Sequence, residues 1–166
     1  MAGAPRAERI RMRARTPSRP AVRSVLCPVD FSRNAGAALR YAAALARQTG
    51  VRLIVLHVAD PLLMSAAATA AYDTRALWRR TDRDLRRFAS RHIGRAVPPR
   101  RVTIAMTLGP AAAEILKAAR RHRCDLLVMG RQGLSGPSRW LFGSTTDTVL
   151  RRSAVPVTVV PVRRAR

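Results

Sequence analysis

Residues 129–145 read MGRQGLSGPSRWLFGST, and they carry three glycines and a serine at the spacing Gly-x2-Gly-x9-Gly-Ser. An apolar run, residues 126–129, leads directly into Gly130, and a helical pattern begins at Ser144. Glycines between a strand and a helix let the backbone approach an anion closely and adopt a positive φ. The first turn of such a helix presents unpaired N–H groups and the positive end of the helix dipole. The spacing therefore predicts a phosphate-binding site at the carboxyl end of a buried strand.

Apolar runs and helical patterns alternate along the rest of the chain. Strands are expected at residues 24–30, 51–58, 101–108, 125–130 and 156–162. Between them we expect a helix from an N-cap at Ser32 to Gly50, a long helix through 77–92 with an Ala-rich lead-in at 65–71, a helix from Gly109-Pro110 to His122, and a short helix from Ser144. Strict alternation with right-handed crossovers predicts an α/β fold with a single doubly wound, five-stranded parallel sheet and helices on both faces.

Two polar features follow separate strands of this predicted sheet. Asp30 comes just after the first apolar run, and Gly130 ends the fourth. Ligands of doubly wound sheets bind outside the carboxyl ends of the strands, where the strand order reverses. If the first and fourth strands are neighbours, Asp30 and the glycine-rich stretch flank the same crevice.

The chain is strongly basic: its 166 residues include 32 Lys and Arg against 9 Asp and Glu, a net charge of +23. This charge has two interpretations, a polyanionic partner such as nucleic acid or a composition that covers solvent-exposed faces with Arg. The arginines are scattered through every segment with few aromatics among them, whereas a nucleic-acid footprint is usually clustered. The scatter favours the second interpretation, although non-specific adhesion to nucleic acid is expected from charge alone.

The composition also suggests one ordered domain between two basic ends. Residues 1–23 hold seven Arg and no apolar periodicity, which predicts a disordered basic arm, and 163–166 form a basic tail. Residues 24–162 form the predicted domain. Its apolar runs are too short to span a bilayer, so we expect a cytoplasmic protein without a membrane partner. Cys27 and Cys124 are expected to be free thiols, and no metal-ligand spacing is present.

Several of these motifs together resemble the universal stress protein family, and the likeness covers nearly all of residues 24–162. The motifs are CPVDFS, VLHV, VMGRQG, LFGST and VPVTVV, in chain order. The resemblance implies the strand order 3-2-1-4-5. It also implies membership in the nucleotide-binding branch of the family, which carries the glycine motif and binds ATP, here with Mg²⁺.

The resemblance also implies a set of binding residues. Asp30 would bond the ribose or lie near the metal-bound phosphates beside Pro28, and Val58 would pack on the adenine edge. The other expected contacts are Met129 and Gly130 at the nucleoside, Gly133 with backbone room for the phosphates, and Gly143, Ser144 and Thr145 capping the phosphates. Structural alternatives stay open for several of them. Asp30 would instead cap the first helix, and Val58, Met129 and His57 would be core residues. Arg131 and Arg139 either reach the phosphates or are solvent-exposed.

The expected function is that of an ATP-binding stress-response regulatory protein, in which nucleotide occupancy alters conformation or contacts with an unidentified protein partner. By resemblance, a homodimer through the last strand is expected, since its valine-rich edge, 155–162, would otherwise be exposed. The alternative is an adaptor that binds nucleic acid or acidic protein through its excess of Arg. An enzyme is disfavoured, because the chain has no Walker A lysine motif, no His near the loop and few carboxylates for Mg²⁺. At most slow ATP hydrolysis is expected.

Overall fold

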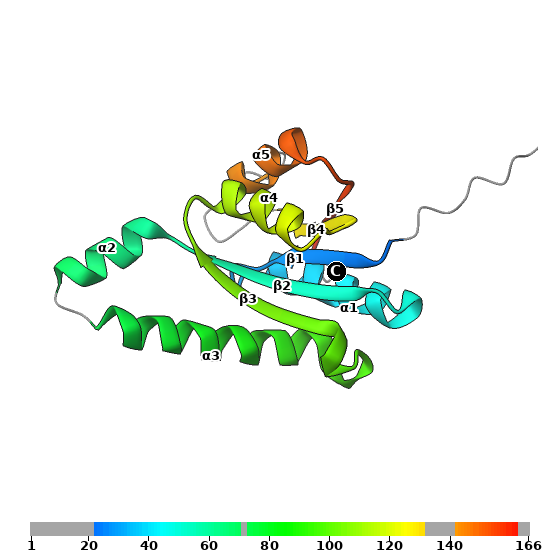
Figure 1. Ribbon diagram of the computed structural model, residues 1–166, viewed down its shortest axis with the longest axis horizontal. Helices are drawn as coiled ribbons and strands as arrows, with labels where there is room; N and C mark the ends of the chain where they lie inside the picture. Colours follow the sequence, from blue (N-terminus) through cyan, green and yellow to red (C-terminus); the bar gives the residue numbers. More distant parts are fainter. Residues whose placement is uncertain (1–21, 71–72, 132–141, 163–166) are drawn as a thin grey trace, which may run out of the picture.

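The centre of the molecule is a parallel sheet of five strands in the order β3-β2-β1-β4-β5. The computed structural model describes residues 22–70, 73–131 and 142–162 (Figure 1). The strands are β1 (Ser24–Pro28), β2 (Arg52–Ala59), β3 (Val102–Leu108), β4 (Leu126–Gly130) and β5 (Val157–Val160). Both the predicted fold class and the strand order 3-2-1-4-5 are confirmed.

Helices cover both faces of this sheet. Figure 1 shows α3 (Thr74–Ile93) below the sheet and α4 (Ala111–Arg121) with α5 (Ser144–Arg152) above it. Helix α1 (Arg33–Thr49) packs on the α3 side, where both helices contribute to one core cluster. Two 3-10 turns, η1 (Gly94–Ala96) and η2 (Pro99–Arg101), connect α3 to β3. Because helices bury both faces, the strands read as near-continuous apolar runs.

The alternation of side chains along each strand divides the core into two clusters. On β1, Cys27 faces the cluster with α1 and α3, whereas Leu26 faces the cluster with α4 and α5. Strand side chains point alternately to opposite faces, so a single strand supplies both layers. Cys27 and Cys124 are both buried free thiols, as expected. Burial raises the pKa of each thiol, to about 11 for Cys124, so neither is a reactive thiolate at neutral pH.

An aromatic cluster holds the turn that follows β1. Phe31 has a φ of 65°, an unusual conformation for a bulky side chain, and its ring lies 4.6 Å from that of His57 and 5.6 Å from that of Phe88. His57 also contacts the residue that follows β1, since its Nδ1 lies 2.9 Å from the Val29 carbonyl oxygen. These contacts join the ends of β1 and β2 to α3. They position the backbone on which Asp30 lies.

The boundaries of α1 confirm two local predictions. The hydroxyl of Ser32 accepts a hydrogen bond of 3.0 Å from the Ala35 N–H, which makes Ser32 the N-cap. Gly50 follows the helix in the left-handed conformation, with a φ of 75°.

One element differs from the prediction. The Ala-rich stretch at 65–71 was expected only as a lead-in to the long helix, but α2 (Pro61–Thr69) is a separate helix. It begins directly at the Asp60-Pro61 pair that ends β2, because Asp60 caps it, accepting from the Leu62 N–H at 2.8 Å, and Pro61 occupies its first turn. Helix α2 buries none of its residues and extends beyond the sheet (Figure 1). Among the described residues, no helix has the length and apolar character needed to cross a membrane.

Candidate functional site

The carboxyl ends of β1 and β4 lie side by side, as the crevice prediction requires. Leu26 on β1 pairs with Leu127 on β4. Continuing this parallel register by two residues places Pro28 opposite Met129. Asp30 follows β1 and Gly130 ends β4 at the same edge of the sheet. The strand order reverses between these two strands, which is where ligands of doubly wound sheets bind.

Two hydrogen bonds attach the beginning of α5 to the end of β4. The buried Thr146 hydroxyl donates to the Gly130 carbonyl at 3.1 Å. The Gly143 N–H donates to the Arg131 carbonyl, also at 3.1 Å. Together they bring the second half of the glycine motif back to its first half. Thr146 was not identified from the sequence. A threonine in a short polar helix gives no local sign that its hydroxyl bonds to a carbonyl 16 positions earlier in the chain.

The N-terminus of α5 presents free backbone donors. Gly143 is the N-cap, and no side chain caps it. The first helical hydrogen bond runs from the Asp147 N–H to the Gly143 carbonyl at 2.9 Å. The N–H groups of Ser144, Thr145 and Thr146 therefore have no partner within the helix. Such groups, together with the helix dipole, favour an anion.

Gly130 has a structural role that the sequence did not reveal. A Cβ atom at this position would lie 2.7 Å from the carbonyl carbon of Asn34 and 2.9 Å from its oxygen. The backbone of α1 thus packs directly on the end of β4, at a distance that only glycine permits. This requirement holds whether or not a ligand is bound.

Asp30 lies at the edge of the sheet and shapes the turn before α1. Its Oδ1 accepts a hydrogen bond of 3.0 Å from the Ser32 N–H. The capping of α1 falls to Ser32, so the alternative that Asp30 is the helix cap is wrong. Asp30 is half-buried at the position predicted to face the ribose or phosphates.

The remaining predicted residues differ in exposure. The Met129 side chain is 4% exposed and belongs to the core, so only its backbone reaches the edge. Val58 is half-buried against the same cluster. Ser144 is exposed and Thr145 half-buried. Gly133, like Arg139, lies outside the described residues.

Few acidic side chains lie near this edge of the sheet, and Glu114 is hydrogen-bonded to its neighbours. Glu114, in the first turn of α4, accepts a hydrogen bond of 2.7 Å from the Thr107 hydroxyl and a second from Lys117 at 3.3 Å. The hydrogen bond from Thr107 is the main cause that lowers the pKa of Glu114. Within the described ranges, no group of three or more His, Cys, Asp or Glu residues is placed to hold a metal ion.

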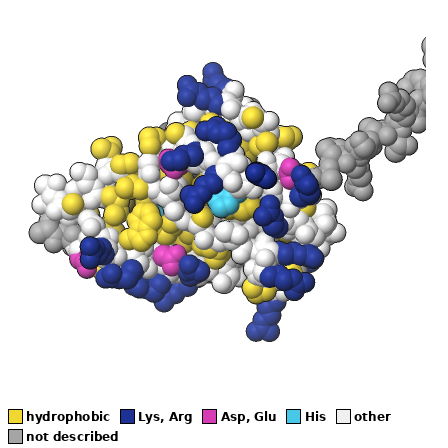
Figure 2. Space-filling view, in the orientation of Figure 1, with side chains coloured by type: hydrophobic (Ala, Val, Ile, Leu, Met, Phe, Trp, Pro, Cys, Tyr) yellow, Lys and Arg dark blue, Asp and Glu magenta, His cyan; other side chains and the backbone are white. Residues whose placement is uncertain are grey.

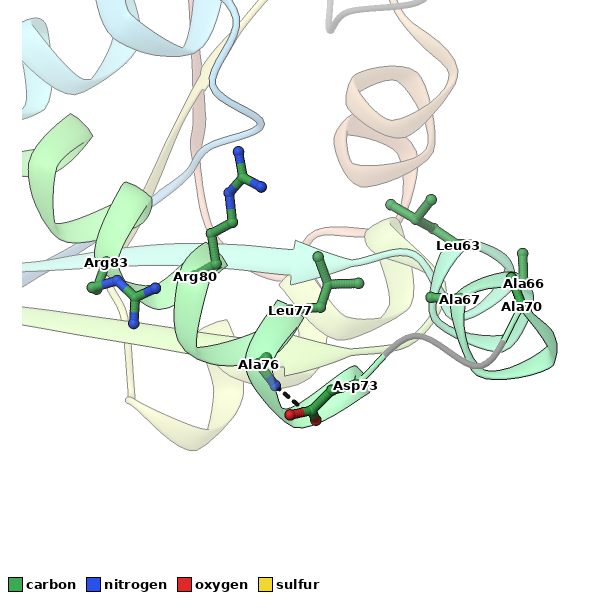
Figure 3. Close-up of a pocket in the computed structure, with 9 residues that line it drawn as sticks. All are labelled: Leu63, Ala66, Ala67, Ala70, Asp73, Ala76, Leu77, Arg80 and Arg83. Atoms are coloured by element: carbon green, nitrogen blue, oxygen red, sulfur yellow. Dashed lines mark hydrogen bonds between the residues drawn. The ribbon is translucent and has the colours of Figure 1, made fainter.

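An apolar groove of about 710 Å³ lies elsewhere, between α2 and α3 (Figure 3). Leu63 comes from α2, and Leu77 and Arg80 come from α3. None of the predicted binding residues lines it. The groove is therefore distinct from the predicted binding site at the ends of β1 and β4.

A five-stranded parallel sheet in the order β3-β2-β1-β4-β5, with helices on both faces, defines a doubly wound α/β protein. More specifically, the chain belongs to the Universal stress protein family, whose profile matches residues 21–161. A universal stress protein of Thermus aquaticus is 30% identical over 138 residues, which cover 83% of this chain and 98% of that protein.

Solved structures show the same fold. The hypothetical protein MJ0577 superposes with a TM-score of 0.71 at 24% identity, covering 87% of this chain and 99% of that one. A universal stress protein in complex with cAMP gives 0.62 at 24% identity, covering 84% and 97%. The universal stress protein of Archaeoglobus fulgidus in complex with dAMP gives 0.58 at 20% identity, covering 83% and 96%.

Proposed function

We propose that this protein binds ATP, together with Mg²⁺, in the crevice between β1 and β4 and acts as a stress-response regulator. The observation that carries the proposal is the N-terminus of α5, whose free N–H groups are held against the end of β4 by Thr146 and Gly143. Occupancy of the crevice then changes the conformation of the protein or its contacts with a partner.

The solved relatives support the nucleotide part of this proposal. One binds cAMP and another binds dAMP, so the fold accommodates an adenine nucleotide in other members of the family. We extend this to ATP because the α5 N-terminus offers donors for more than one phosphate. Ser144 and Thr145 would add their hydroxyls to these donors.

We assign the other predicted residues to parts of the nucleotide from their places along the edge of the sheet. Asp30 faces the ribose or the metal-bound phosphates, beside Pro28, and Val58 borders the adenine. Gly130 and the backbone of Met129 form the floor next to the nucleoside. Gly133 supplies room and an N–H for the phosphates.

We propose regulation rather than rapid hydrolysis. Phosphoryl transfer relies on several positioned charges around the phosphates. The described carboxylates near this end of the sheet are few: Asp30 follows β1, Glu114 accepts from Thr107 at the end of β3, and Asp147 in the first turn of α5 pairs with Arg151. The His57 ring packs against Phe31 on the face of the sheet that α1 and α3 cover, away from the N-terminus of α5.

Thermal denaturation tests the site. We expect saturating ATP and Mg²⁺ to raise the Tm by about 5–10 °C, because a ligand at 100 times its Kd stabilises the folded state by about 2.7 kcal/mol. Ser144→Asp should reduce this shift to about 1 °C or less, since the new carboxylate repels the phosphates. The helix dipole stabilises a carboxylate in the first turn of a helix, so the variant should fold normally.

Thr74→Asp is the matched control. It introduces the same carboxylate at the first position of α3, on the other face of the sheet, and should leave the ATP shift unchanged. A full ATP shift in the Ser144→Asp variant would contradict the site. Comparison with AMP and cAMP measures how much of the shift the additional phosphates contribute.

We further propose a homodimer through the outer edge of β5. This strand is the last of the sheet, and its described residues pair on one side only, with β4. The carbonyls of Pro156 and Val160 face β4, accepting from Leu127 and Arg131. Backbone groups alternate in direction along a parallel strand, so the N–H of Val159 points away from the sheet. An unpaired strand edge of this kind is a template for a second copy.

Light scattering tests this dimer. We expect a mass of about 36 kDa, twice the 18.2 kDa of one chain. Val159→Pro removes the outward N–H without affecting the bonds to β4 and should shift the mass to that of a monomer. A monomer mass for the unchanged chain would contradict the proposal.

A further inference from the structure

The amino-terminal edge of the sheet, opposite the crevice, brings together arginines that are far apart in the sequence. Arg101, Arg52, Arg23 and Arg123 lie at or just before the starts of β3, β2, β1 and β4, which are neighbours in that order. We call these four residues the arginine row. Neighbouring strands lie about 4.8 Å apart, so the row spans roughly 14 Å.

Backbone contacts confirm that the row is continuous. The Arg52 N–H donates to the Arg23 carbonyl at 2.9 Å, and the Ser24 hydroxyl donates to the Arg123 carbonyl at 2.8 Å. The guanidinium of Arg101 lies against Gly50, beside Arg52, where a Cβ on the glycine would be 3.1 Å from its Nη1. Arg23, Arg52 and Arg123 are exposed, and Arg101 is half-buried.

The helices add charge to the same edge. In this fold the helices run antiparallel to the strands, so their last turns lie where the strands begin (Figure 1). These last turns carry Arg47, Arg91, Arg120, Arg121, Arg151 and Arg152. Figure 2 shows dark-blue side chains at the right of the view, and others along the top and the lower left of the molecule.

One acidic side chain, that of Asp125, lies beside the row. Asp125 lies just before β4, and its Oδ2 accepts from the N–H groups of Arg23 at 2.8 Å and Ser24 at 3.0 Å. These hydrogen bonds, the one from Arg23 first, and the positive charge of Arg23 lower the pKa of Asp125, so this carboxylate offsets one of the four charges of the row. The ion pairs among the described residues lie on α3, α4 and α5, and none of them includes a residue of the row.

We propose that the arginine row binds the phosphate backbone of single-stranded nucleic acid without sequence preference. Guanidinium groups bind phosphates bidentately, and exposed arginines along one edge of the sheet offer several such groups to a strand with one charge per nucleotide. An acidic protein partner fits less well, because a protein interface also needs an apolar centre. Among the described residues, the large exposed apolar side chains all lie away from the row; they are Tyr41, Leu62, Leu63, Leu108 and Phe142.

Fluorescence anisotropy with the full chain tests this proposal, with labelled oligouridine and the DNA strand of equal length as probes. The variant R23Q/R52Q/R101Q/R123Q should bind at least about tenfold more weakly near physiological salt. The slope of log affinity against log salt should fall by about 3, because each phosphate contact on a single strand contributes about 0.7. RNA and DNA should bind equally, since the contacts are to phosphates.

The control variant R40Q/R75Q/R80Q/R83Q removes the same charge from exposed positions on α1 and α3. It should retain the affinity within about twofold. Equal losses in the two variants, or equally tight binding of polyglutamate, would overturn the proposal. Both variants should keep the thermal shift with ATP, so failure of the row and failure of the nucleotide site are distinguishable.

Discussion

Replacing Gly130 with Ala is expected to lower the free energy of unfolding by about 3 kcal/mol and the Tm by roughly 6–12 °C. The added Cβ would lie 2.7 Å from the Asn34 carbonyl carbon and 2.9 Å from both its oxygen and its Cβ. Two of these three atoms belong to the backbone of α1, so the helix itself must shift away from β4. The hydrogen bond from Thr146 to the Gly130 carbonyl is disturbed by the same movement.

Gly36→Ala is the control for this substitution. A Cβ at Gly36 would lie 2.5 Å from Nε2 of His92, an atom of a half-buried side chain rather than of the backbone. Alanine also has a helix propensity about 1 kcal/mol better than glycine, which offsets part of the contact. We expect a loss below about 1 kcal/mol. Urea denaturation of both variants measures the difference, and equal losses would show that the backbone contact at Gly130 is unimportant.

Leu85→Ala should destabilise the protein by a similar amount, about 2–5 kcal/mol. Leu85 is fully buried on α3, within the cluster that joins this helix to α1 and the sheet. Most of the surface of α3 is charged and exposed, and Leu85 and Ala89 are its buried residues. Removal of the leucine therefore leaves a cavity at the main contact of the helix.

The matched control is Leu62→Ala on α2, where the side chain is 79% exposed. This change should alter the free energy of unfolding by no more than about 0.5 kcal/mol. Calorimetry of the two leucine variants gives a direct comparison of the same truncation in two environments. A loss at Leu62 as large as that at Leu85 would indicate that α2 is packed more tightly than its exposure implies.

Local patterns predicted the elements of the fold well, since their causes lie within a few residues. The cap at Ser32, the left-handed Gly50 and the apolar runs of the buried strands each follow from short-range chemistry. The Asp60-Pro61 pair contained the start of α2 as well, but the same pair also fits a strand end. The pair is recognised as a helix start only once the residues after it are known to be helical.

In the candidate site, too, some features were predicted from the sequence and others were seen only in the structure. Its glycine spacing and its position after two strands could be inferred from the chain, and the neighbouring placement of β1 and β4 is confirmed. The hydrogen bond of Thr146 and the contact of Gly130 with Asn34 were missed. Both depend on how closely two elements approach one another, and no periodicity in one element records the position of another.

The arginine row shows most clearly what the sequence alone does not predict. Composition and periodicity established a basic chain with a parallel α/β fold, because charge and apolar spacing are properties of the residues themselves. Along the chain, Arg23, Arg52, Arg101 and Arg123 are separated by 22 or more positions and look dispersed. Strand pairing sets them side by side, since parallel strands that are joined by long crossovers all begin at one edge. The folded register, rather than any local signal, turns a scattered charge into a surface.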